Sequence, residues 1–204
     1  SGQICMSTER IIVDQKIADD FVKKFAAKAG ALPLGDPRKP DPVVLGSVIG
    51  MSTVEHCNAL IDDALAKGAG LLCGGKADST LMPATVLDHV TPAMRIYREE
   101  TFGPVKCIVR VNGVEEAVAC ANDNEYGLSA AVFGGDIARA FNVARRIDSG
   151  ICHVNGPTVH DEAQMPFGGV KGSGIGRFGG KAGIAEFTEL RWITVQTTPR
   201  HYPF

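Results

Sequence analysis

The sequence has no long apolar run, no excess of positive charge and no CxxC pair, and each absence excludes a class of protein. Its apolar runs fall far short of the roughly 20 residues that a membrane-spanning helix needs. A net charge of −2 provides no basic surface for nucleic acid. The six scattered cysteines favour reduced thiols over a disulfide framework. With no signal-peptide pattern at the start of the sequence, we expect a cytoplasmic protein that contacts neither membrane nor nucleic acid.

What is present is ordinary globular composition with alternating strand and helix patterns. The 204 residues are 45% hydrophobic and 22% charged, enough for one sizeable core. Ile17, Phe21 and Phe25, with Ala18, Val22 and Ala29 beside them, predict the apolar face of a helix that Asp14 caps. Ser52 begins a capping-box pattern for a second helix. The segment 105–154 predicts strand, helix, strand, helix, strand, with parallel buried strands, and its second helix has an apolar stripe of Ile137, Phe141, Ala144 and Ile147. Further strands are expected at 9–13, 69–73 (buried), 83–90 and 190–197, and a short helix at 181–189 with Ile184 and Phe187 inward.

The reactive candidate is Cys5, in the segment Ser1-Gly2-Gln3-Ile4-Cys5-Met6-Ser7-Thr8-Glu9-Arg10. A thiolate that attacks a carbonyl carbon forms a covalent thiohemiacetal or thioester. For a lone cysteine an inert core position is the better interpretation, because free cysteine is among the most buried residue types. The rest of the sequence decides between these two interpretations.

Three further segments follow the Cys5 decapeptide: Glu99-Glu100-Thr101-Phe102-Gly103-Pro104-Val105, Tyr126-Gly127-Leu128-Ser129-Ala130, and Pro166-Phe167-Gly168-Gly169-Val170-Lys171-Gly172-Ser173-Gly174. In this order, the four segments resemble the NAD(P)-dependent aldehyde dehydrogenase family. Together they span nearly the whole chain, so the ordered set is far more specific than any one member. The resemblance implies a three-layer αβα catalytic domain over residues 1–189, with a mostly parallel sheet.

The resemblance also implies roles for individual residues. Cys5 would be the nucleophile, Glu100 would bind the nicotinamide ribose, and Phe102 would lie beside the nicotinamide ring of NAD, with NADP possible. Ile4, Met6 and Phe167 would line the substrate pocket. Residues 150–165 look most like aromatic aldehyde dehydrogenases acting on salicylaldehyde, vanillin or benzaldehyde, with His160, Asp161 and Glu162 available to a ring hydroxyl. No metal is expected, since the adjacent Cys152 and His153 would point to opposite faces of a strand.

Several family features are missing from this sequence. The family's general base, its oxyanion-hole asparagine and most of its cofactor fold precede the cysteine, and Glu9 is in the wrong place to substitute for the base. We therefore expect the chain to be the C-terminal part of a longer enzyme and inactive, or nearly so, alone. Residues 190–204 are expected to form a strand and tail that pair with another subunit, in a homodimer or homotetramer.

Two functions of other classes stay open at this point. Cys5 with His153 or His160, oriented by Asn155 or Asp161, would make a hydrolase that needs no NAD. A non-catalytic assembly domain would use only the C-terminal strand. Gly174-x-Gly176-x-x-Gly179 formally matches a dinucleotide fingerprint, but no strand leads into it and no acidic residue follows at the required spacing, so we expect a tightly folded loop there.

Overall fold

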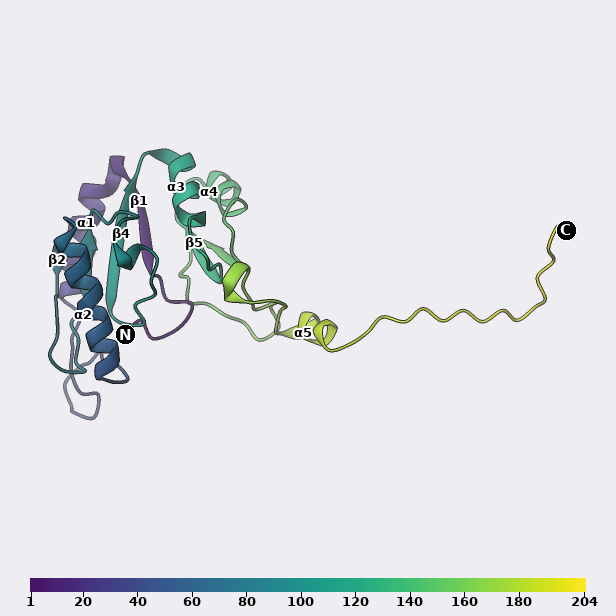
Figure 1. Ribbon diagram of the computed structural model, residues 1–204, viewed down its shortest axis with the longest axis horizontal. Coiled ribbons are helices and arrows are strands. Elements are labelled where there is room, and N and C mark those ends of the chain that lie inside the picture. Colours follow the sequence, from purple (N-terminus) through teal and green to yellow (C-terminus); the bar gives the residue numbers. More distant parts are fainter.

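The computed structural model describes residues 1–204 and shows an α/β fold with two sheets (Figure 1). The larger sheet has the order β1-β4-β3-β2 and consists of β1 (Arg10–Asp14), β4 (Val105–Val111), β3 (Thr85–Asp88) and β2 (Gly70–Cys73). β1, β4 and β3 run parallel, and only β2 is antiparallel to its neighbour. The smaller sheet pairs β5 (Ser129–Val132) with β6 (Ile151–Val154) in parallel. The predicted mostly parallel α/β fold is confirmed.

Helices cover both faces of the larger sheet because each face buries apolar side chains. Successive side chains of a strand point to opposite faces. Val105, Cys107, Val109 and Val111 of β4 join the core cluster formed with α2 (Met51–Ala66), whereas Ile108 joins the cluster formed with α1 (Gln15–Gly30). The sheet therefore lies between α1 and α2, which gives the three layers expected of the fold.

Helix α1 begins as predicted and buries most of the predicted apolar face. The Asp14 carboxylate accepts the N–H of Lys16 and caps the helix. Ala18 and Val22 are buried, and Phe21 and Phe25 pack partly buried against the same cluster. Ile17, which is 59% exposed, is the exception. Ala18 is completely buried, and its small side chain lets the helix backbone lie close to the sheet, which a larger residue at this position would prevent.

Two other local predictions are wrong. Helix α2 begins at Met51 with Gly50 as its N-cap and has no side-chain cap, because Ser52 already lies inside the first turn. Strand β2, expected to be buried, is the edge of the sheet and exposes Leu71 and Leu72. It pairs with β3 only, so its outer edge is unpaired in this chain.

The predicted β-α-β-α-β run does not form one sheet. β4 is already hydrogen-bonded on both sides, to β1 and β3, so β5 cannot pair with it. Helix α3 (Gly113–Asn122) therefore carries the chain from one sheet to the other, and only β5, α4 (Ile137–Ala144) and β6 form a parallel unit with a helical connection. Two short 3-10 helices, Arg95–Tyr97 and Lys171–Ser173, lie in the connecting loops.

The C-terminal part is far less buried than the sheets. Helix α5 spans Gly180–Glu186, and Ile184 and Phe187 are exposed rather than inward. Ile137 and Phe141 of α4 are also exposed. Residues 190–204 form no strand within this chain and extend away from the body (Figure 1), because a strand needs a hydrogen-bonded neighbour and none is adjacent. No helix is long and apolar enough to cross a membrane.

Candidate active site

Cys5 lies in a tight turn that precedes β1. The Ser7 N–H donates to the Ile4 carbonyl at 2.8 Å, which places Cys5 and Met6 at the corner of the turn. Cys5 is exposed, whereas Met6 is only 8% exposed and anchors the turn against the protein. The Cys5 N–H donates to no group of the chain. The turn thus presents both a thiol and a free backbone donor at its outer side.

The second part of the site is the segment from Glu100 to Phe102, which leads into β4. Thr101 is completely buried, Glu100 is partly buried and Phe102 is 43% exposed. Phe102 has φ +43°, a left-handed conformation that few non-glycine residues adopt. The Glu100 carboxylate accepts no hydrogen bond, while its backbone carbonyl accepts one from His56 Nε2 at 2.9 Å. Burial, followed by the charge of Glu9, raises the pKa of Glu100.

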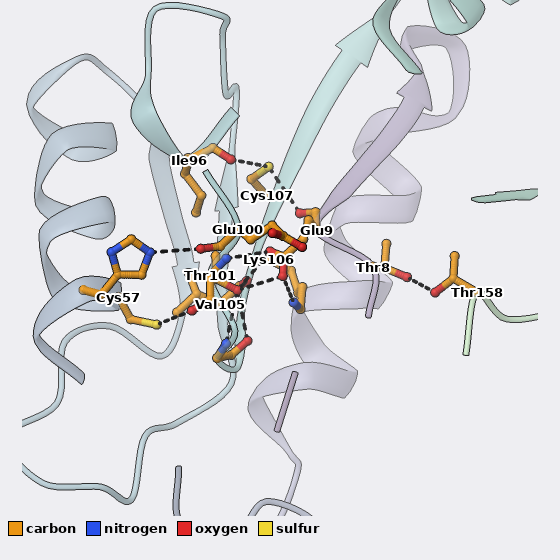
Figure 2. A network of polar contacts seen from close by, with 12 residues as sticks. Thr8, Glu9, Cys57, Ile96, Glu100, Thr101, Val105, Lys106, Cys107 and Thr158 are labelled. Carbon is orange, nitrogen blue, oxygen red and sulfur yellow. Dashed lines mark hydrogen bonds and ion pairs between the residues drawn. The ribbon is translucent and has the colours of Figure 1, made fainter. Parts of the chain in front are cut away.

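The Cys5 turn and the Glu100–Phe102 segment are held together by Glu9 and Thr101 (Figure 2). The Glu9 carboxylate accepts the Thr101 N–H at 3.2 Å and the Thr101 hydroxyl at 2.9 Å. Nearby, a side chain at Gly2 would lie 2.1 Å from the Gly103 carbonyl oxygen, so the two backbones approach as closely as glycine allows. Residues about 90 positions apart in the sequence therefore form one site.

Lys106 is the cation of this site. Its Nζ lies 3.6 Å from Glu9 Oε1 and makes no hydrogen bond, although it is buried. Burial lowers the pKa of Lys106, and the charge of Glu9 works in the opposite direction. The two side chains are 17% and 23% exposed, so their attraction is little screened by solvent.

Arg10 fixes the start of β1, directly after the site. Its guanidinium donates to the carbonyl oxygens of Cys120, Ala121 and Asp123 at the C-terminal end of α3. It also lies 4.8 Å from the centre of the Tyr97 ring. A cation at a helix C-terminus is favourable, so Arg10 ties the Cys5 turn to a rigid element.

The loop after β6 reaches the Cys5 turn through Thr158. The hydroxyls of Thr8 and Thr158 are 2.9 Å apart (Figure 2), and the Ser129 hydroxyl donates to the Thr158 carbonyl at 2.7 Å. Phe167 is half-buried and exchanges backbone hydrogen bonds of 2.8 and 2.7 Å with Phe178. Ile4 is exposed and Met6 is buried. That Ile4, Met6 and Phe167 line a substrate pocket stays a prediction.

The two histidines that favoured a hydrolase do not form a dyad with Cys5. His153 Nε2 is buried without a partner, and His160 Nε2 lies 3.6 Å from Glu162. The two rings pack edge to face at 5.4 Å. A general base must lie within hydrogen-bond reach of its nucleophile, and neither ring meets this condition here.

The glycine motif at Gly174 to Gly179 is a folded loop. A side chain at Gly176 would lie 2.9 Å from a Glu186 carboxylate oxygen, and that carboxylate accepts the Arg177 N–H. A carboxylate at this point repels phosphate. A separate hollow of about 690 Å³ beside α2, lined by Glu55, Asn58, Asp62, Lys76 and Asp78, contains none of the predicted site residues.

The other cysteines contrast with Cys5. Cys107 is completely buried, and burial raises the pKa of its thiol to about 12. Burial likewise raises the pKa of Cys57 to about 11, and its thiol donates to the Thr101 carbonyl. Thiolate is the reactive form, so these two thiols are inert and serve packing.

Sequence reasoning missed three residues of this site: Glu9 as a clamp, Thr101 and Lys106. Lys106 did carry a signal, because it and Arg110 are the two charged residues of a mostly apolar central strand, and a charge at such a position needs a partner. Nothing in the sequence pointed to Glu9 as that partner, since the contact arises only from the parallel pairing of β1 with β4.

Comparison with known proteins identifies the family. Residues 1–193 match the model of the aldehyde dehydrogenase family. The chain is 58% identical over 202 residues to vanillin dehydrogenase of Pseudomonas fluorescens, covering 99% of this chain and 42% of that protein. It therefore spans less than half the length of this curated relative.

Solved structures agree. Salicylaldehyde dehydrogenase from Pseudomonas putida G7, complexed with salicylaldehyde, superposes with a TM-score of 0.93 at 51% identity, over 100% of this chain and 42% of that one. An aldehyde dehydrogenase C variant from Pseudomonas syringae, complexed with NAD+ and octanal, gives 0.85 at 37% identity, over 92% and 39%. The Cys5 turn, the segment beside it and these matches agree: the chain belongs to the aldehyde dehydrogenase family.

Proposed function

We propose that the protein containing this chain oxidises an aromatic aldehyde to the carboxylic acid, with NAD as cofactor and Cys5 as nucleophile. The observation that carries the proposal is the exposed Cys5 turn, clamped by Glu9 and Thr101 against the segment that bears Glu100 and Phe102. Membership of the family supports the reaction type. Similarity to vanillin and salicylaldehyde dehydrogenases supports an aromatic substrate.

The residues of the second segment fit a nicotinamide cofactor. The Glu100 carboxylate has no protein partner and is free to accept hydrogen bonds from two ribose hydroxyls, a device common to dinucleotide sites. The exposed ring of Phe102 offers an apolar surface beside it. When bound, NAD supplies the acceptor for the hydride that the aldehyde carbon loses; NADP is the alternative carrier.

The chain's own residues hold the reacting group. The Cys5 thiolate forms a carbon–sulfur bond with the aldehyde carbon, and the carbonyl oxygen takes up the negative charge. The Cys5 N–H donates to no group of the chain, so it is available to donate a hydrogen bond to that oxygen and stabilise its charge. After oxidation, Cys5 retains the acyl group as a thioester until water releases the acid and restores the thiolate. The resemblance implies that the general base for this water precedes Cys5, so no residue here receives that role.

The finer assignments follow from the same proposal. Ile4, Met6 and Phe167 would line an apolar pocket for a planar ring, and His160, Asp161 and Glu162 would offer polar contacts to a ring hydroxyl. Residues 1–189 would form the catalytic domain, and residues 190–204 would pair with another subunit in a homodimer or homotetramer. A cytoplasmic location is part of this proposal.

The proposal is tested by NADH formation from NAD and salicylaldehyde, with octanal as the aliphatic comparison. The assay uses this chain and the same chain extended upstream to its natural start. Turnover by the extended protein alone, faster with salicylaldehyde, is the expected result. Equal turnover of the two aldehydes would contradict the aromatic assignment. No reduction of either NAD or NADP would contradict the proposed reaction.

The matched variants in this assay are Cys5→Ala and Cys73→Ala. Cys5→Ala should lower turnover by at least about 10⁴-fold, because removing a nucleophile removes the covalent route. It should leave stability unchanged, because Cys5 is exposed. Cys73 is a half-buried cysteine of edge strand β2, and its replacement should leave turnover unchanged. Retained activity in Cys5→Ala would refute the nucleophile.

A further inference from the structure

Glu9 and Lys106 form a mostly buried ion pair beside the site. The proposed reaction gives neither residue a role. We propose that they are positioning residues: Glu9 clamps the cofactor-binding segment to the nucleophile turn through Thr101, and Lys106 neutralises Glu9 so that the clamp can be buried. This inference rests on the proposed function, because it assigns the two residues to that same site.

The clamp acts on the residue between the two cofactor-binding side chains. Thr101 is completely buried, and both its N–H and its hydroxyl donate to Glu9. The Thr101 hydroxyl also accepts a hydrogen bond from the Gly103 N–H at 3.3 Å. Hydrogen bonds of Thr101 therefore fix the backbone on both sides of Phe102. A shift of Thr101 would therefore displace Glu100 and Phe102 together, and would displace them relative to Cys5, four positions before Glu9.

The surroundings of Glu9 explain why a lysine stands in β4. A carboxylate held mostly out of water needs a partner of opposite charge. Lys106 Nζ faces Glu9 Oε1 at 3.6 Å, and a side chain at Gly2 would lie 3.3 Å from that same nitrogen. Lys106 thus fills the space between the Cys5 turn and β4 and donates no hydrogen bond to the chain. Its contribution is charge and volume.

The arrangement also makes the carboxylate of Glu9 specific. In Glu9→Gln the amide keeps one oxygen acceptor for Thr101, but its other end is a donor that faces the Lys106 ammonium. Two donors then meet where an ion pair stood, and the clamp loses its geometry without loss of volume. Lys106→Met removes the opposing donor, so the double variant Glu9→Gln/Lys106→Met should lose less than Glu9→Gln alone.

The decisive measurement is the dissociation constant of NAD by calorimetry, together with KM and kcat, in the upstream-extended protein. Glu9→Gln should weaken NAD binding and raise its KM about 10- to 100-fold, the usual range for hydrogen bonds to a charged group. The kcat at saturating NAD should change less than about 3-fold, because Cys5 is untouched. Partial recovery of affinity in the double variant is the second expected result.

The matched control is Asp88→Asn, which removes one carboxylate from another cation of β4, Arg110. That pair is also buried, but it faces α1 and Asp19 rather than Thr101. Asp88→Asn should lower stability at least as much as Glu9→Gln and leave the NAD dissociation constant unchanged. Equal weakening of NAD binding by both variants would show a general loss of stability and overturn the positioning role.

A readout without cofactor separates the two proposals. Hydrogen exchange at the Thr101 amide should be faster in Glu9→Gln than in wild type and unchanged in Asp88→Asn. If wild type binds NAD while Glu9→Gln shows wild-type affinity and exchange, the positioning role alone falls. If wild type binds neither NAD nor NADP and oxidises no aldehyde, both the proposed function and the positioning role are wrong.

Discussion

The larger sheet and the segment that follows β6 are stabilised in different ways. The sheet, from Arg10 to Val111, contains two apolar clusters whose members are almost completely buried. After Val154 the chain has no buried hydrophobic side chain, and Thr158 is its only buried polar one. The candidate nucleophile and the candidate cofactor segment adjoin the sheet, directly before β1 and β4, whereas the candidate substrate residue Phe167 belongs to the sparse segment.

The sparse segment depends on backbone contacts instead of apolar burial. A side chain at Gly150 would lie 1.8 Å from the Gly168 carbonyl oxygen, so β6 and the later loop touch backbone to backbone. The Phe167 and Phe178 backbones pair nearby. Substitution of surface side chains should therefore change the stability of this loop little, whereas a side chain at Gly150 should destabilise it strongly. The candidate nucleophile thus lies beside the well-packed sheet, whereas the candidate substrate residue Phe167 lies on a loop that is easier to vary.

The largest stability difference should come from matched apolar truncations in the two regions. Leu60→Ala removes a completely buried side chain from the core cluster and should cost about 3 kcal/mol of unfolding free energy. Ile184→Ala removes a mostly exposed side chain of α5 and should cost less than about 0.5 kcal/mol. Urea unfolding measures both. Similar losses for the two variants would show that the C-terminal segment is as well packed as the sheet.

A smaller and pH-dependent difference is expected from Asp88. Burial alone would raise the pKa of Asp88, but hydrogen bonds from Arg110 and from the His89 N–H outweigh it, and the pKa is lowered. A lowered folded pKa means that the stabilisation is fully present above the unfolded value of about 3.9 and is lost as the pH falls below it.

Asp88→Asn tests this dependence. The variant should cost about 2 to 3 kcal/mol near neutral pH, because Arg110 loses its buried partner. The difference from wild type should shrink as the pH is lowered through about 4, in unfolding curves recorded across that range. Asp36 also has a lowered pKa, from its hydrogen bonds with Arg38, but it lies on an exposed loop. Asp36→Asn is therefore the control, and a pH dependence as large as that of Asp88→Asn would contradict the argument.

Most helices and strands could be predicted from the sequence, but their faces and partners could not. The Asp14 cap and the apolar strand Val105–Val111 are local features and were found. Apolar periodicity at Ile137 and Phe141 correctly indicated a helix, yet both side chains are exposed in this chain. Periodicity reports that a face is apolar and says nothing about what covers it. Strand order depends on which neighbours are already paired, as β4 shows.

The site divides in the same manner. Cys5, Glu100 and Phe102 were proposed from motifs, and the structure brings their two segments together. Glu9 and Thr101, 92 positions apart, needed the structure, because their contact depends on the register in which Arg10 pairs with Cys107. Met6 flanks the nucleophile and was placed with the pocket, but it packs inward in this chain. A motif identifies residue types for chemistry, and tertiary pairing decides which neighbours hold them in place.

The smallest effect on folding should come from deleting residues 190–204. Leu190, Trp192 and Val195 are exposed, and the segment pairs with no strand of its own chain. The deletion should therefore change the unfolding free energy by less than about 0.5 kcal/mol, because no buried surface is lost. Its effect should appear in association instead: alternating apolar residues in an unpaired segment favour pairing with the sheet of another subunit. Sedimentation of the upstream-extended protein, with and without these residues, measures this. Loss of self-association at unchanged stability would support an assembly role, whereas a marked loss of stability would mean that the tail packs on its own chain.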